Sequence, residues 1–223
     1  MTAQLPSRRM QCVNLGCGQT PTPGWLNVDN SPSVRLAGHP LLLAMGSKLG
    51  VLKARQVEFA NAARQGGVVW ADAGNLPLED GSASIVYSCH MLEHLSRDRV
   101  RVALLEIRRV LMPGGYVRLV LPDLARLIEG YQKDGDADAF MKGTYLGHEN
   151  HENLQQRVVA LFVGDRLHAW MYDAQSFIRL LEELGFTDVQ AVGAGETNIP
   201  DTGDLDLSER DDESFYVEAK QPS

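Results

Sequence analysis

The stretch VNLGCG, residues 13–18, decides the fold. It begins as a short strand and ends in two glycines separated by one residue, Gly16 and Gly18. Glycine has no Cβ, so it permits a tight turn and lets the backbone approach a ligand closely. In an open α/β sheet, ligands bind at the carboxyl ends of the strands, which is where such a turn would lie. The glycine pair alone is equally compatible with a structural turn, so the rest of the chain must decide.

Strands and helices alternate along the remainder of the sequence. Apolar runs predict strands at 12–15, 25–29, 68–72, 85–88, 116–121, 188–192 and 215–219, and the last two are expected to pair as a hairpin. Helical periodicity predicts helices at 97–111 and 174–184, with another opening at Pro122-Asp123. We therefore predict an α/β fold: a Rossmann-like, doubly wound, mostly parallel seven-stranded sheet with helices on both faces.

The length of 223 residues suits one domain with a substantial core. We expect a single domain over 1–223 with two excursions, at 31–67 and 134–172. The first contains helical pieces at 41–52 and 57–63, and 134–169 is polar and irregular. Because long irregular segments in compact domains are usually lids or disorder, we expect both excursions to roof one pocket.

Composition and charge limit the classes of partner that we expect for this protein. The net charge of −8 disfavours a long phosphate track, so no nucleic-acid partner is expected. No apolar run approaches the ~20 residues of a membrane helix, and the three cysteines lack zinc-like spacing, so we expect a cytoplasmic protein with reduced thiols. Much of the excess acid lies between residues 196 and 213, which we interpret as a solvated loop.

Two acids close successive predicted strands. Asp29 is positioned to accept hydrogen bonds from a ribose diol, and Asp72 to accept one from an adenine amino group, with a loop cap as the alternative for Asp72. A dinucleotide fingerprint would require a third glycine where this chain has Pro21, so NAD binding is disfavoured.

At this point a family resemblance is plain. VNLGCG (13–18) resembles the first motif of class I S-adenosylmethionine-dependent methyltransferases. DAGNLP (72–77), MLEH (91–94) and RVLMPGG (109–115) look like later motifs of the methyltransferase type 11-like group. GWLNVD (24–29) and HAWMYD (168–173) look like a subgroup sometimes associated with bacterial surface-glycan or secondary-metabolite loci.

The resemblance implies S-adenosyl-L-methionine as cofactor. Gly16 and Gly18 would flank its methionine part, Asp29 its ribose and Asp72 its adenine, with Ser88 and His90 beside the sulfonium. The implied cofactor-binding residues are Asn14, Leu15, Gly16, Cys17, Gly18, Asp29, Asp72, Ala73, Ser88 and His90. Two features depart from the group: the stretch between Gly18 and Asp29 is too short for the usual first helix, and Ser84 replaces an aspartate.

The HMLEH stretch, residues 90–94, offers the candidate chemistry. His90 and His94 are candidate general bases for an oxygen or nitrogen acceptor. The pattern also matches H-x-x-E-H of certain zinc peptidases, but it follows a parallel strand at a cofactor site. A looser likeness is the Glu-x-x-Glu-His metal site of some RNA and quinone O-methyltransferases, with His90 replacing the first glutamate. The remaining alternative is that Glu93 and His94 only cap the next helix; we expect no metal.

The later excursion supplies candidate acceptor contacts. His148, His151 and His168 suggest a second metal hypothesis, but a substrate lid is favoured, lined by Tyr145, His148, His168, Trp170 and Tyr172. We expect methyl transfer to a small-molecule or sugar-containing acceptor. The alternatives are a catalytically inactive methyltransferase-like binding protein and a nucleotide-linked oxidoreductase. The oligomeric state stays open, a homodimer included.

Overall fold

The computed structural model describes residues 11–50, 52, 54–146 and 167–223. Its centre is one seven-stranded sheet in the order β3-β2-β1-β4-β5-β7-β6. The strands are β1 (Gln11–Leu15), β2 (Leu26–Asp29), β3 (Val69–Trp70), β4 (Ala83–Cys89), β5 (Leu111–Pro122), β6 (Thr187–Val192) and β7 (Ser214–Lys220).

The sheet is parallel from β3 to β5, and β7 runs antiparallel to both β5 and β6. The predicted fold class and the terminal hairpin are therefore confirmed. The chain reverses between β1 and β4, which are neighbours in space but not in sequence. This reversal is the switch point at which α/β sheets bind ligands.

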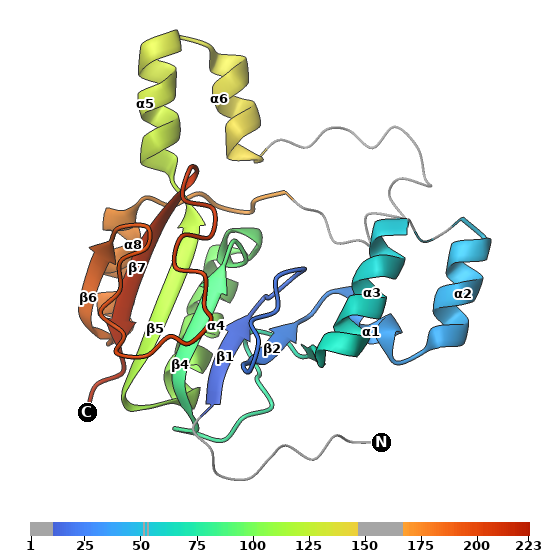
Figure 1. The fold of residues 1–223 in the computed structure, drawn as a ribbon. Helices are drawn as coiled ribbons and strands as arrows, with labels where there is room; N and C mark the ends of the chain where they lie inside the picture. Colours follow the sequence, from blue (N-terminus) through green and yellow to red (C-terminus); the bar gives the residue numbers. More distant parts are fainter. Residues whose placement is uncertain (1–10, 51, 53, 147–166) are drawn as a thin grey trace.

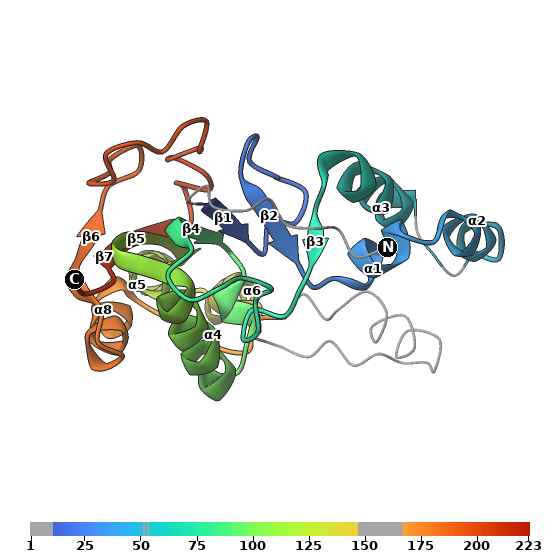
Figure 2. The same cartoon turned by 90° about the horizontal axis from the view of Figure 1, so that it is seen from below.

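Two amphipathic helices cover one face of the sheet, α4 (Arg97–Val110) and α8 (Ala174–Glu183) (Figure 2). Both bury apolar residues at helical spacing, with Val100, Leu104 and Ile107 fully buried on α4 and Phe177 and Leu181 on α8. They pack with strand residues into the main hydrophobic core. The Ser96 hydroxyl caps α4 by accepting from the Arg99 N–H at 3.4 Å.

A long loop, residues 193–213, lies over part of the other face (Figure 1). Leu205 of this loop packs with Tyr87, Val120 and Tyr216 of the sheet in a separate apolar cluster. The predicted solvated loop is present, with most of its acids exposed, and Leu205 anchors it to the sheet. Glu209 of the loop also accepts from the Tyr87 hydroxyl of β4 at 2.7 Å and from the Thr20 hydroxyl at 3.0 Å.

The first excursion folds into three helices beside the β3 edge of the sheet (Figure 2). They are α1 (Pro32–Ala37), α2 (Pro40–Lys48) and α3 (Ala54–Gly66), which refine the predicted pieces at 41–52 and 57–63. Leu43, Ala60 and Ala63 belong to a small core of their own. Leu41 faces outward and is 80% exposed, so only part of the apolar run packs.

A helical hairpin above the end of β5 leads into the second excursion (Figure 1). It consists of α5 (Leu124–Asp134) and α6 (Ala137–Thr144), so the prediction of irregular structure from residue 134 onward is wrong. Gly135 closes α5 with φ 68°, and Asp136 caps α6 by accepting from the Ala139 N–H at 2.9 Å. Residues 147–166, with His148 and His151, lie outside the described residues. Within the described part of the chain, no helix is long and apolar enough to cross a membrane.

Candidate functional site

The turns after β1, β2, β3 and β4 lie side by side along one edge of the sheet. These four strands are consecutive in space and parallel, so their carboxyl ends meet there. Gly16–Gly18 follows β1, Asp29 ends β2, Asp72 follows β3 and His90 follows β4. The topology thus gathers the predicted cofactor residues from separate parts of the sequence.

The glycine turn after β1 is joined directly to Asp29. Gly16 and Gly18 have φ of 73° and 49°, a conformation that glycine adopts without strain. The Gly18 N–H donates to Asp29 Oδ2 at 3.0 Å, and the Ser31 N–H donates to Asp29 Oδ1 at 2.7 Å. Each carboxylate oxygen therefore has one partner and keeps acceptor capacity for a hydroxyl.

Gly16 also fixes the turn against the loop after β4. A Cβ at Gly16 would lie 2.4 Å from Met91 Cγ, which leaves no room for any side chain. The Gly16 backbone therefore packs directly against the Met91 side chain, and this contact holds the turns after β1 and β4 together. This contact explains why the first position of the glycine pair must be glycine.

Two asparagines that sequence reasoning assigned no structural role hold the loop between β1 and β2. Asn14 donates to the Thr20 carbonyl at 3.1 Å and to the Thr22 hydroxyl at 3.0 Å. Asn27 accepts from the Thr22 N–H at 2.8 Å and donates to the Thr22 carbonyl at 3.0 Å. Both are buried, so they fix the shape of this loop. The side chains of Leu15 and Cys17, two further cofactor candidates on β1 and its turn, are also buried.

Asp72 is held by a partner on α4. Its two carboxylate oxygens lie 2.6 and 2.7 Å from Arg99 Nη2, and Oδ1 also accepts from the Gly74 N–H at 2.7 Å. The hydrogen bond from Gly74 shows that Asp72 caps its own loop, as in the alternative interpretation from the sequence. The ion pair with Arg99 joins residues that are far apart in the sequence. Both side chains are about half exposed, and Ala73 beside them is buried. An adenine amino group would have to share Asp72 with Arg99.

His90 is tightly bound to its surroundings. Its backbone has φ of 47°, its Nε2 lies 2.7 Å from Ser214 Oγ on β7, and its Nδ1 lies 3.5 Å from Glu93 Oε1. Burial, followed by repulsion from Arg210, lowers the pKa of His90 to about 3. His90 is therefore neutral near pH 7 and a weak base. Ser88 of β4, two residues before His90, is buried, and its hydroxyl lacks a hydrogen-bond partner among the described residues.

Glu93 is the unexpected residue of this edge. It lies in the 3-10 helix η1 (Leu92–His94), its side chain is 1% exposed, and burial raises its pKa to about 8. Ser96 caps α4, so the alternative in which Glu93 caps that helix is wrong. The backbone carbonyl of Glu93 accepts from the Ala169 and Trp170 N–H groups at 2.7 and 3.2 Å. These hydrogen bonds bring the 167–173 segment to the site.

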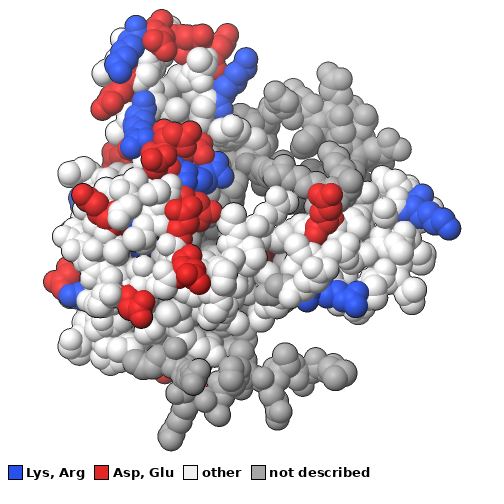
Figure 3. Space-filling model, in the orientation of Figure 1, with Lys and Arg blue, Asp and Glu red and all other residues white. Residues whose placement is uncertain are grey.

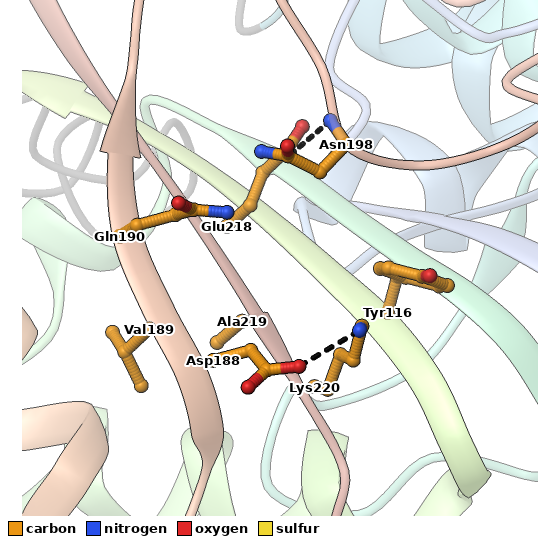
Figure 4. Close-up of a pocket in the computed structure, with 8 residues that line it drawn as sticks. All are labelled: Tyr116, Asp188, Val189, Gln190, Asn198, Glu218, Ala219 and Lys220. Carbon is orange, nitrogen blue, oxygen red and sulfur yellow. Dashed lines mark hydrogen bonds and ion pairs between the residues drawn. The ribbon is translucent and has the colours of Figure 1, made fainter.

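Two cavities in the described part of the molecule lie at different distances from this edge of the sheet. One of about 210 Å³ lies between Gly18–Pro21 and α3, beside the glycine turn. It is smaller than the ~300 Å³ of typical ligand pockets, so it suits part of a cofactor. The other, of about 310 Å³, is lined by β5, β6 and β7 (Figure 4). Tyr116 places it toward the opposite end of β5, roughly 20 Å from Pro122 at ~3.3 Å per residue.

Comparisons with known proteins agree with this geometry. A family model described as "Methyltransferase domain" matches residues 49–119. A 66-residue stretch is 41% identical to a malonyl-[acyl-carrier protein] O-methyltransferase of Alcanivorax borkumensis, covering 28% of this chain and 22% of that protein. The matched stretch thus spans about a fifth of that curated relative.

Two solved structures have a similar fold. One is described as a SAM-dependent methyltransferase, possible histamine N-methyltransferase, from Thermotoga maritima, with a TM-score of 0.50 at 18% identity over 98% of this chain and 84% of that chain. The other is a SAM-dependent methyltransferase from Methanosarcina mazei, with a TM-score of 0.51 at 14% identity over 95% and 92%. Residues 49–119 thus match a methyltransferase domain, and the chain has the fold of S-adenosylmethionine-dependent methyltransferases.

These matches support S-adenosylmethionine as the cofactor, and the strand ends fit it. A Cβ at Gly18 would meet only the Gly16 carbonyl at 4.0 Å, so the space beside the turn is open. Asp29 presents acceptor oxygens next to that space. The absence of a helix after the glycine turn is the clearest departure from the family, because the N–H groups of Gly16 and Cys17 donate to the Val28 carbonyl instead.

The predicted acceptor residues divide into two groups. Tyr145, 57% exposed, lies 5.3 Å between ring centroids from His168, and Trp170 is half exposed beneath Arg97. Tyr172 does not form a pocket wall. It is 4% exposed and packs edge-on against Phe177 in the main core, because its backbone bridges to Asp123 at the end of β5.

Proposed function

We propose that the protein transfers the methyl group of S-adenosylmethionine to a small-molecule or sugar-containing acceptor. The observation that carries the proposal is the meeting of Gly18, Asp29 and His90 at one edge of the sheet, in a chain of this family. The sulfonium supplies a methyl carbon that is already activated for displacement, so positioning can provide most of the rate.

Each residue of the edge has a proposed task. Gly16–Gly18 gives the backbone clearance for the methionine part, and Asp29 accepts from the ribose hydroxyls. His94 is the better placed of the two candidate bases, because 35% of its side chain is exposed, whereas that of His90 is 9% exposed and burial lowers its pKa to about 3. Tyr145, His168 and Trp170 border the same region and are the proposed acceptor contacts.

Surface charge supports an acceptor other than nucleic acid. The chain carries a net charge of −8. Acidic side chains outnumber basic ones over the 193–213 loop and the α5–α6 hairpin on the face shown in Figure 3. Such a surface repels phosphate backbones. We also propose a cytoplasmic location and a single domain with 31–67 and 134–172 as acceptor-side elements; a homodimer fits the proposal equally well as a monomer.

Incubation with a metabolite extract and methyl-labelled S-adenosylmethionine tests this function. We expect a mass-detected product that carries the label and that forms more slowly with Asp29→Ala when the cofactor is below saturation. Binding of S-adenosylhomocysteine without transfer of label to any small molecule would favour the inactive, methyltransferase-like binding protein. Labelled RNA or DNA would contradict the proposed acceptor class.

A further inference from the structure

Three histidine side chains converge on Glu93 at the carboxyl end of β4. His90 Nδ1, His94 Nε2 and His168 Nε2 lie 3.5, 3.8 and 3.9 Å from Glu93 Oε1. His168 arrives from a distant part of the sequence, held by its backbone N–H to the Tyr145 carbonyl and by the Ala169 N–H to the Glu93 carbonyl. The folded chain thus completes a cluster that the sequence around residue 90 only begins.

Each ring is anchored through its other nitrogen. His94 Nδ1 lies 3.1 Å from the Leu167 carbonyl oxygen, His168 Nδ1 lies 3.2 Å from Met171 Sδ, and His90 Nε2 lies 2.7 Å from Ser214 Oγ. A carbonyl oxygen only accepts, so in the neutral ring His94 Nδ1 carries the hydrogen and Nε2 presents a lone pair toward Glu93. Thioether sulfur is only a weak acceptor, and His168 also has a hydrogen bond with the Thr144 backbone, so Met171 alone does not set the His168 tautomer. This anchoring of one ring nitrogen is how proteins orient histidine ligands of metal ions.

The carboxylate at the centre lacks partners. Glu93 is 1% exposed, and neither of its oxygens accepts a hydrogen bond from a described residue. A buried, unpaired carboxylate is costly, so it requires either a proton or a cation. A protonated Glu93 would still lack a hydrogen-bond acceptor among the three rings, because separations of 3.5–3.9 Å exceed the hydrogen-bond range.

A metal ion fits the spacing better. One ligand atom each from Glu93, His94 and His168 lies within 4.8 Å of the other two. Around a tetrahedral ion with bonds of ~2.0–2.1 Å, ligand atoms are separated by ~3.4 Å. Moving each side chain inward by a few tenths of an ångström brings the three donors to such an ion. His94 is partly exposed, so a fourth position faces solvent.

We propose that Glu93, His94 and His168 bind a divalent cation of the Zn²⁺ or Co²⁺ class, with one coordination position open beside the proposed acceptor site. Two imidazoles and one carboxylate are the donor set that such borderline ions accept. As far as this site serves methyl transfer, it rests on the proposed function. The open position would then take an acceptor hydroxyl and lower its pKa, so that the hydroxyl proton is released to solvent and His94 acts as a ligand and no longer as the base.

Cobalt(II) titration of the full-length, chelator-treated protein tests the site. We expect one equivalent to bind, with visible absorption bands of the intensity typical of four-coordinate Co²⁺, and displacement by Zn²⁺. Glu93→Gln and His94→Asn should each weaken binding at least 100-fold, a loss larger than the 10–100-fold typical of outer-shell changes. His39→Asn, an exposed histidine outside the cluster, should leave binding unchanged.

S-adenosylhomocysteine binding, measured on the same samples, separates this proposal from the proposed function and reports folding of the variants. Retained S-adenosylhomocysteine binding without Co²⁺ binding at one equivalent would overturn the metal site and leave the methyltransferase assignment intact. Co²⁺ binding that survives both Glu93→Gln and His94→Asn would also overturn it. Co²⁺ binding in a protein that does not bind S-adenosylhomocysteine would support the metal site and contradict the proposed function.

Discussion

At the scale of single residues, Asp29 links the glycine turn to the ligand it is proposed to hold. It receives the N–H groups of Gly18 and Ser31 and keeps lone pairs directed to the same edge. An ionised carboxylate only accepts hydrogen bonds, so Asp29 favours a ligand that offers hydroxyl donors, such as a ribose diol. The residue therefore has a structural and a binding task at once.

Asp29→Ala should weaken S-adenosylhomocysteine binding by ~1.5–3 kcal/mol, the scale of a hydrogen bond to a charged group. Calorimetric titration measures the change, and Asp134→Ala, an exposed aspartate at the end of α5, is the matched control. An unchanged affinity in Asp29→Ala would remove this residue from the cofactor site.

Arg118 and Glu218 form a buried ion pair that fastens the 193–213 loop. Arg118 is 0% exposed and donates to Glu218 Oε1 at 2.6 Å and to the carbonyls of Glu196 and Leu207 at 2.8 Å. Glu218 Oε2 accepts from the Asn198 N–H at 2.7 Å. The pair thus connects β5 and β7 to both ends of the loop.

Arg118→Met should lower the free energy of unfolding by ~3–5 kcal/mol, because it leaves the Glu218 charge buried without its cation. Adding Glu218→Gln should restore part of the loss, since the uncompensated charge is removed and the side chain still accepts from Asn198. Urea denaturation gives both values. Arg101→Met, which breaks an exposed pair with Glu183, should cost at most ~1 kcal/mol. A similar cost at both arginines would show that the buried pair does not fasten the loop.

At the scale of secondary-structure elements, α8 depends on its amino-terminal cap. Asp173 Oδ1 accepts from the Ser176 N–H at 2.6 Å, and the Ser176 side chain completes a capping box. The hydrogen bond from the Ser176 backbone is the main cause that lowers the pKa of Asp173 below its ordinary value of 3.8. The ionised cap therefore stabilises the fold.

Asp173→Ala should cost ~0.5–2 kcal/mol at pH 7. Because the folded-state pKa is lowered, the stabilisation is complete above pH ~4 and is lost as the pH falls through the folded-state pKa. Asp173→Asn caps without titrating, so the wild type should lose stability relative to this variant below pH ~4. Urea midpoints from pH 7 to pH 3 check this, and parallel pH curves for the two proteins would contradict it.

At the scale of the whole molecule, the sequence predicts what local patterns encode. The order of strands and helices, the hairpin of β6 and β7, and the positions of Gly16 and Asp29 all follow from short runs of residues. Contacts between distant segments do not: the pairing of Asp72 with Arg99, of His90 with Ser214, and of Glu93 with His168 requires the folded chain. The helix α6 was missed because its apolar residues are few and its start depends on a cap.

The central claim, that this edge of the sheet binds S-adenosylmethionine and not a dinucleotide, is tested most directly by thermal shift. At a concentration of S-adenosylhomocysteine 100 times its dissociation constant, binding stabilises the folded state by ~2.7 kcal/mol. For a chain of this length that raises Tm by ~5–10 °C, and equimolar NAD should leave Tm unchanged because Pro21 replaces the fingerprint glycine. A Tm raised by NAD and unmoved by S-adenosylhomocysteine would contradict the account.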